Sequence, residues 1–184
     1  MYFTKLTALF SAILGPRGGK YINNPYGAFE DTTDQVAANT TTAYAVTFNT
    51  TDFSNGVTLS NSSRLNVSQA GIYNIQFSIQ LTNSTNAPQD VDVWFRKNGT
   101  NIDNSNSRFA FAARKSPGDP FHIVAALNFF ASLTANDYVE IMWRPTDVGV
   151  QIEHYAASST PTRPVVPSVI ATLSFVSNLS TETA

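Results

Sequence analysis

The chain lacks cysteine altogether and has few charged residues for its length. Its 184 residues include no Cys, two His and two Met, and charged side chains make up 13% of the total, well below the usual share. The absence of cysteine excludes thiol nucleophiles, cysteine-ligated zinc, iron–sulfur clusters and disulfide bonds. With 11 basic and 13 acidic residues, the chain also lacks the positive excess of nucleic-acid-binding proteins. We therefore expect no nucleic acid among its partners.

Uncharged polar residues are abundant, in contrast to the scarce charged ones. The chain contains 17 Asn, 18 Ser and 21 Thr, together with 12% aromatic residues. The aromatic residues and the many Val and Ile exclude a disordered chain, because they supply enough apolar surface for a core. A chain of this length forms one domain and buries roughly 70% of the surface that its unfolded form exposes.

An amphipathic helix is predicted near the N-terminus. Apolar side chains recur there at the spacing i, i+3, i+4, i+7 and i+8, namely Leu6, Leu9, Phe10, Ile13 and Leu14. Gly15 and Pro16 end the pattern, and residues 16–26 have the composition of a linker. A helix this short is marginal in water, so its apolar stripe needs a surface to dock on. We favour another chain over this chain's own domain, and a single basic residue in 1–15 disfavours a membrane.

A period of two replaces the helical period after residue 26. Residues 71–83 and 89–97 alternate apolar and polar side chains, as half-buried strands do. Asn55-Gly56 and Asn98-Gly99 are tight-turn signals. Further strands are predicted at 43–49, 107–114, 120–133, 137–144, 148–156 and 167–177. We therefore expect an all-β antiparallel sandwich or barrel over residues 27–178, followed by a C-terminal tail at 179–184.

Two of the predicted strands, 120–133 and 137–144, are apolar on both faces. A monomer rarely exposes a contiguous apolar patch of that size, so one face of each strand needs a cover. We interpret this as a subunit interface, and the alternative is a central strand covered by a loop. The residues predicted to form the interface are Val124, Phe130, Val139, Ile141 and Trp143.

Four segments, in this order, resemble strands of the complement C1q and tumour necrosis factor superfamily: 71–77, 93–99, 133–139 and 168–173. The first is similar to that superfamily's Gly-x-Tyr-x-Phe-x-Phe strand, with Ile75 in place of the first Phe. The third is similar to its Leu-x-x-Gly-Asp-x-Val stretch, with Asn136 in place of the Gly. The resemblance implies a jelly roll that assembles as a homotrimer, with both chain ends at the trimer base. The chain has no collagen-like stalk, and its Asn- and Thr-rich texture resembles bacteriophage virion proteins of that group.

The sequence contains no pattern that indicates catalysis or a cofactor. His122 and His154 lack the His-x-His or His-x-x-x-His spacing of metal ligands. No Gly-x-Ser-x-Gly segment is present to position a nucleophilic serine, and no pair of carboxylates has a spacing that identifies a general acid and base. We therefore expect neither an enzyme nor a metal or cofactor site.

The resemblance and the N-terminal arm together lead to a functional expectation. We expect a capsid decoration or cement protein: a homotrimer on the outer surface of the virion whose arms bind the major capsid protein. Three arms on one trimer bind multivalently, so the trimer is held tightly even where each contact is weak. The alternative is a tail-fibre or receptor-binding tip that contacts the host surface through loops at 114–118 and 145–147.

Overall fold

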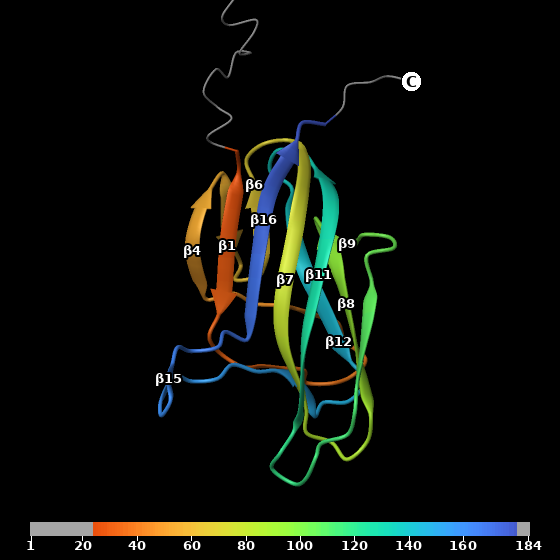
Figure 1. The fold of residues 1–184 in the computed structure, drawn as a ribbon. Coiled ribbons are helices and arrows are strands. Elements are labelled where there is room, and N and C mark those ends of the chain that lie inside the picture. The colour runs from red at the N-terminus through yellow and green to blue at the C-terminus, as the bar shows by residue number, and fades with distance from the viewer. Residues whose placement is uncertain (1–23, 180–184) are drawn as a thin grey trace, which may run out of the picture.

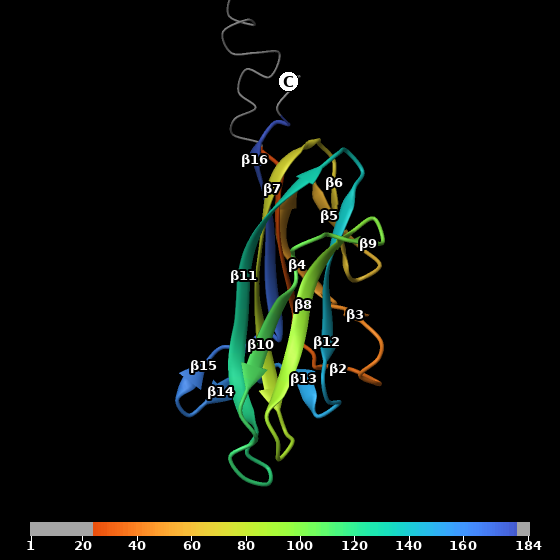
Figure 2. The same cartoon turned by 90° about the vertical axis from the view of Figure 1, so that its right-hand side faces the viewer.

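The computed structural model describes residues 24–179, which form two antiparallel β-sheets that face each other (Figures 1 and 2). The sheet nearer the viewer in Figure 1, called the front sheet below, has the order β2-β13-β7-β16-β1-β4, and β11 also pairs with β7. Its strands are β1 (Tyr26–Asp31), β2 (Gln35–Val36), β4 (Thr50–Asn55), β7 (Gly71–Asn83), β11 (Phe121–Leu133), β13 (Val150–Ile152) and β16 (Val169–Ser177).

The second sheet, called the back sheet, has the order β10-β8-β12-β6-β5, and β3 and β9 pair with β12 and β8. Its strands are β3 (Tyr44–Ala45), β5 (Val57–Ser60), β6 (Arg64–Val67), β8 (Gln89–Lys97), β9 (Thr100–Asn101), β10 (Ser107–Phe111) and β12 (Tyr138–Pro145). A small separate hairpin joins β14 (Ser158–Ser159) to β15 (Thr162–Arg163). Residues 24–179 contain no helix, and hence none that is long and apolar enough to cross a membrane.

The core lies between the two sheets and is built from the alternate side chains of each strand. β7 and β11 pair over 13 residues, from Gly71 opposite Leu133 to Asn83 opposite Phe121, so their inward side chains form one continuous apolar face. The sheets meet where the Phe95 ring of the back sheet lies 5.8 Å from the Phe77 ring and 5.0 Å from the Phe129 ring, centroid to centroid. The all-β antiparallel expectation is confirmed, because these contacts make the domain a sandwich.

The strands with clear alternation appear where the sequence predicts them. The structure also contains short polar strands that the sequence pattern does not predict. β7 and β8 cover 71–83 and 89–97 as predicted. β1, β4, β5 and β6 were not predicted, because segments such as 50–55 carry too few apolar side chains to display a period of two. Asn98 and Gly99 adopt φ values of 49° and 84° in the left-handed region, so this pair forms the predicted turn. Asn55 and Gly56 instead connect β4 of the front sheet directly to β5 of the back sheet, with a φ of 66° at Gly56, so the tight-turn prediction is wrong there.

The first and the last strand of the sandwich lie side by side and antiparallel, so β1 begins at the end of the molecule where β16 ends. The backbone N–H of Phe175, near the end of β16, donates to the carbonyl of Pro25, just before β1, at 2.8 Å. Residues 24 and 179, where the described chain begins and ends, therefore lie at one end of the sandwich (Figure 1). The predicted arm, with Leu6, Leu9, Phe10, Ile13 and Leu14, lies outside the described residues.

One carboxylate ties two turns together at this same end of the sandwich. Asp137 accepts a hydrogen bond from the backbone N–H of Thr134 at 2.7 Å and another from the side-chain amide of Asn98 at 2.7 Å, and Lys97 Nζ lies 3.4 Å away. Burial alone would raise the pKa of Asp137, but the hydrogen bonds from Thr134 and Asn98 and the charge of Lys97 outweigh it and lower the pKa to about 2.

Replacing Asp137 by Asn is expected to lower the free energy of unfolding at pH 7 by about 2 kcal/mol. The folded-state pKa is depressed, so the stabilisation is fully present above the unfolded value of 3.8 and is lost as the pH falls toward 2. Chemical denaturation from pH 7 to pH 2 should therefore show the wild type and the variant converging below pH 3. The matched control is Asp119→Asn, an exposed carboxylate 3.7 Å from Lys115 Nζ, which should change the unfolding free energy by less than ~0.5 kcal/mol.

Candidate functional site

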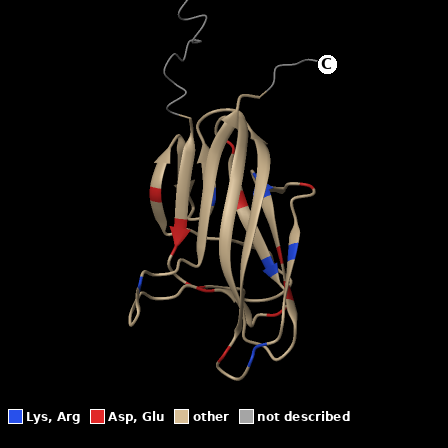
Figure 3. Cartoon of the chain, viewed as in Figure 1, with Lys and Arg blue, Asp and Glu red and all other residues tan. Residues whose placement is uncertain are grey.

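The outer face of β11, β7 and β16 is uncharged and extends across three neighbouring strands of the front sheet. Phe130, Asn74 and Ser174 stand opposite one another across the strands, and Ala126, Ser78 and Ile170 form another such row. None of the three strands contains Asp, Glu, Lys or Arg, so their ribbons carry no coloured residue in Figure 3. Protein interfaces are depleted of charge at their centres, which makes this uncharged face the candidate assembly surface of the domain.

Two of the predicted interface residues project from the uncharged face. Val124 and Phe130 on β11 are each 55% exposed, and Ile170 and Val176 on β16 add further exposed apolar side chains. The inward neighbours of Val124 and Phe130, such as Ala125 and Ala131, are buried in the core. β11 is therefore apolar on both faces, as the sequence predicts, and one of those faces lacks a cover within residues 24–179.

The other three predicted interface residues belong to the core of a single chain, and their assignment to an interface is wrong. Val139, Ile141 and Trp143 point inward from β12 and are each 1% exposed. β12 lies between β8 and β6, and its outer side is also covered, because Met142 on that side is 2% exposed. The alternative interpretation, a covered central strand, is therefore the correct one for β12.

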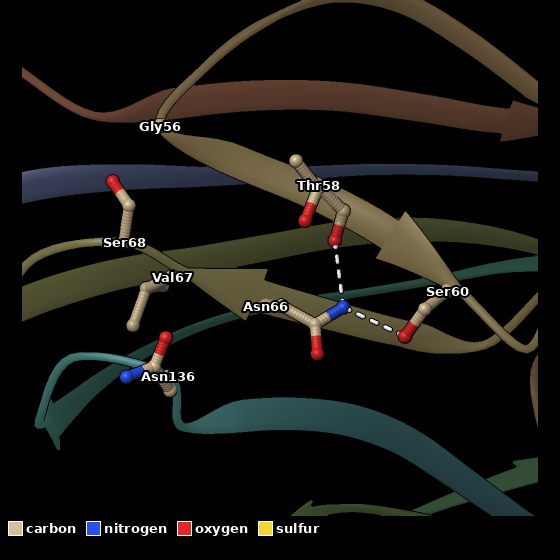
Figure 4. Close-up of a pocket in the computed structure, with 7 residues that line it drawn as sticks. All are labelled: Gly56, Thr58, Ser60, Asn66, Val67, Ser68 and Asn136. Carbon is tan, nitrogen blue, oxygen red and sulfur yellow. Dashed lines mark hydrogen bonds between the residues drawn. The ribbon is translucent and has the colours of Figure 1, made fainter.

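An open pocket of about 370 Å³ lies between β5, β6 and the turn that precedes β12 (Figure 4). The side-chain amide of Asn66 donates to the Thr58 carbonyl at 3.0 Å and to Ser60 Oγ at 2.8 Å. That amide is therefore committed to the fold. No titratable or aromatic side chain lines the pocket, so it offers neither an acid–base group nor a stacking surface; its lining residues are Gly56, Thr58, Ser60, Asn66, Val67, Ser68 and Asn136.

The short segment that follows β13 contains His154 and also contacts His122. His122 Nδ1 lies 2.6 Å from the Tyr155 hydroxyl, which also donates to Glu153 at 2.8 Å. Burial, together with the neighbouring Glu153 carboxylate, raises the pKa of Tyr155, so the hydroxyl stays protonated. His154 Nδ1 lies 2.7 Å from Asp34 Oδ1. No local pattern predicts this convergence, because these residues come from three distant segments of the chain.

The histidine contacts are pairs rather than a metal cage. Burial alone would raise the pKa of Asp34, but hydrogen bonds from the backbone and the ring of His154 lower it. Within residues 24–179, no group of three or more His, Asp or Glu side chains is arranged to hold a metal ion.

Comparison of the chain with protein-family models and with curated proteins gives no match.

Proposed function

We propose that the protein is a jelly-roll subunit that assembles as a homotrimer and decorates the outer surface of a bacteriophage capsid. In this proposal the uncharged face forms the subunit contacts, and the N-terminal arms bind the major capsid protein. The observation that carries the proposal is the combination of one uncharged, partly apolar sheet face with two chain ends that leave from the same end of the sandwich.

The strand pairing supports the jelly-roll assignment. Eight strands pair in nested antiparallel order, the first with the last and so inward: β1 with β16, β6 with β12, β7 with β11 and β8 with β10. Strand pairs nested in this way and folded over into two sheets are the topology of a jelly roll.

Two positions of the resemblance also have a physical explanation in this chain. A side chain at Gly71, the first residue of β7, would collide with the Phe175 ring of β16, so the strand must begin with glycine. Asn136 stands where the superfamily has glycine, and its φ is +72°, a left-handed conformation that Gly and Asn tolerate better than other residues. Both positions favour the superfamily resemblance over a chance match of short motifs.

The arm is tested by comparing capsid binding of the full chain with that of a chain lacking residues 1–20. We expect the shortened protein to keep the mass of a trimer and to lose binding to capsids stripped of this protein, measured by co-sedimentation. A sharper variant replaces Leu9 and Phe10 by Asp within the full chain, and its matched control replaces Thr7 and Ser11 by Ala. Capsid binding retained by the shortened protein would disprove the docking role of the arm.

A tail-fibre or receptor-binding tip is the second candidate, and one observation favours it. The loop between β10 and β11, which includes Lys115 and Asp119, lies at the end of the sandwich opposite the chain ends (Figure 1). A loop in that position is the distal tip of a domain attached through its N-terminus. Copy number in the purified virion separates the two functions, since a capsid decoration protein is present in hundreds of copies and a fibre tip in tens or fewer.

A further inference from the structure

The outer face of the back sheet carries two buried carboxylates, each held between two arginines. Asp92 on β8 accepts a bidentate pair of hydrogen bonds from Arg108 on β10, at 2.8 and 3.0 Å, and Arg144 Nη1 of β12 lies 3.5 Å from its other side. The register places both arginines directly opposite Asp92, one on each neighbouring strand. The three side chains therefore form one row across the sheet.

The second carboxylate repeats this arrangement further along the same strands. Glu140 on β12 accepts hydrogen bonds from Arg96 at 2.9 Å and from the Ser63 hydroxyl at 2.9 Å, and Arg64 Nε lies 3.6 Å away. The Arg64 guanidinium also stacks 4.4 Å above the centre of the Tyr138 ring. Four arginines and these two carboxylates thus share one face. Asp90, two residues before Asp92 on β8, adds a third negative charge, so the face carries a net charge of about +1 in a protein of net charge −2.

The carboxylates lie beneath the arginines, so the charge presented to solvent is positive. The Asp92 and Glu140 side chains are 8% and 3% exposed, whereas that of Arg108 is 60% exposed. Each arginine has five N–H donors, and Arg108 uses its Nε and one Nη2 donor on Asp92, which leaves further donors directed to solvent. The buried carboxylates hold the guanidinium groups in place, which reduces the entropy that an anionic ligand must overcome on binding.

An aromatic side chain lies between the two arginine clusters. Trp94 follows Asp92 and precedes Arg96 on the outer face of β8, about 7 Å from each along the strand. Its indole N–H donates to Asn101 Oδ1 at 2.8 Å, which fixes the ring. Aromatic rings bind the apolar faces of sugar rings, and the guanidinium fork matches carboxylates. The neighbouring strand β9 carries the exposed polar side chains of Thr100 and Asn101.

We propose that this surface, called the arginine–tryptophan face and formed by Arg64, Trp94, Arg96, Arg108 and Arg144, binds an acidic polysaccharide, with carboxylate groups on the arginines and a sugar ring on Trp94. A nucleic acid carries a phosphate on every residue and requires a larger positive excess than this face has. The face belongs to the sheet opposite the uncharged assembly surface, so the two surfaces share no strand.

Binding of the full-length protein to immobilised polygalacturonic acid tests the proposal, with dextran as the neutral polymer. We expect binding to polygalacturonic acid alone, weakened by rising salt and reduced about tenfold by Arg108→Gln. This substitution leaves Asp92 paired with Arg144, so the fold is preserved. The matched control is Arg163→Gln on β15, which removes the same charge from an exposed site outside the face and should leave binding unchanged.

Trp94→Ala separates a polysaccharide from other anions. It should weaken binding to polygalacturonic acid while leaving the weaker attraction to polyglutamate unchanged, because only a sugar ring stacks on the indole. Equal affinity for polyglutamate and polygalacturonic acid would overturn the proposal and point to an acidic protein partner. Binding that is insensitive to both Arg108→Gln and Trp94→Ala would overturn the location. Neither outcome bears on trimer formation or on the arm.

Discussion

Replacing Phe130 by Glu is expected to convert the proposed trimer into monomers that remain folded. Phe130 is 55% exposed on the uncharged face, and the three strands of that face contain no Lys or Arg to pair with the carboxylate that each of three copies would introduce. An unpaired charge buried at an interface costs several kcal/mol, and every subunit contact carries that cost. Sedimentation velocity at micromolar concentration should show the mass of one chain, and circular dichroism should show the β spectrum of the wild type.

The control for this experiment is Phe53→Glu. Phe53 is 62% exposed on β4, on the same sheet, and its ring contacts Tyr26 at 6.1 Å between centroids, but it lies outside β11, β7 and β16. The control should keep the trimer mass, because the new charge remains in solvent. A monomeric wild type, or a Phe130→Glu variant with unchanged mass, would refute the uncharged face as the trimer contact.

Replacing Trp143 by Ala is expected to destabilise the single chain by about 3–5 kcal/mol. The side chain is among the largest fully buried ones and lies 6.0 Å from the Tyr44 ring, centroid to centroid. Its removal leaves a cavity between the sheets that the surrounding strands cannot fill without losing their pairing. Denaturation in the Phe130→Glu background measures this loss without a contribution from assembly.

Trp94, the other tryptophan of the chain, provides the comparison. It stands on the outer face of β8 and is only partly buried, so Trp94→Ala should cost about 1 kcal/mol. A Trp143→Ala variant as stable as Trp94→Ala would contradict the placement of β12 in the core. A loss of unfolding free energy that appears only at concentrations where the protein forms trimers would instead indicate that Trp143 lies at a subunit interface.

The contrast between β11 and β12 shows what a sequence pattern cannot predict, namely which apolar face of a strand is covered. Both strands are apolar on two faces, and the alternation identifies the faces without identifying what covers them. In β12 the inward face with Trp143 meets the core, and the outer face is covered as well, since Met142 and Glu140 are 2% and 3% exposed. In β11, which pairs with β7 alone within the described residues, the face with Val124 and Phe130 is left exposed. The cover depends on which strands become neighbours, and this is set by long-range pairing.

The arginine–tryptophan face also could not be predicted from the sequence. Asp92 and Glu140 lie 48 positions apart, and their arginine partners come from four strands, so no local pattern joins them. The cross-strand register brings them together. Composition shows only that charged residues are scarce. The fold concentrates four of the arginines on one surface and places the three uncharged strands β7, β11 and β16 side by side.

The sequence by itself determined the all-β class, the longest strands and the Asn98-Gly99 turn, because alternation and turn chemistry act over a few neighbouring residues. Only the tertiary structure decided which apolar faces are core and which are exposed, where the charges gather, and that residues 24 and 179 share one end. Those properties arise from pairing between segments such as β1 and β16, which lie far apart in the chain and meet only when the two sheets close over a common core.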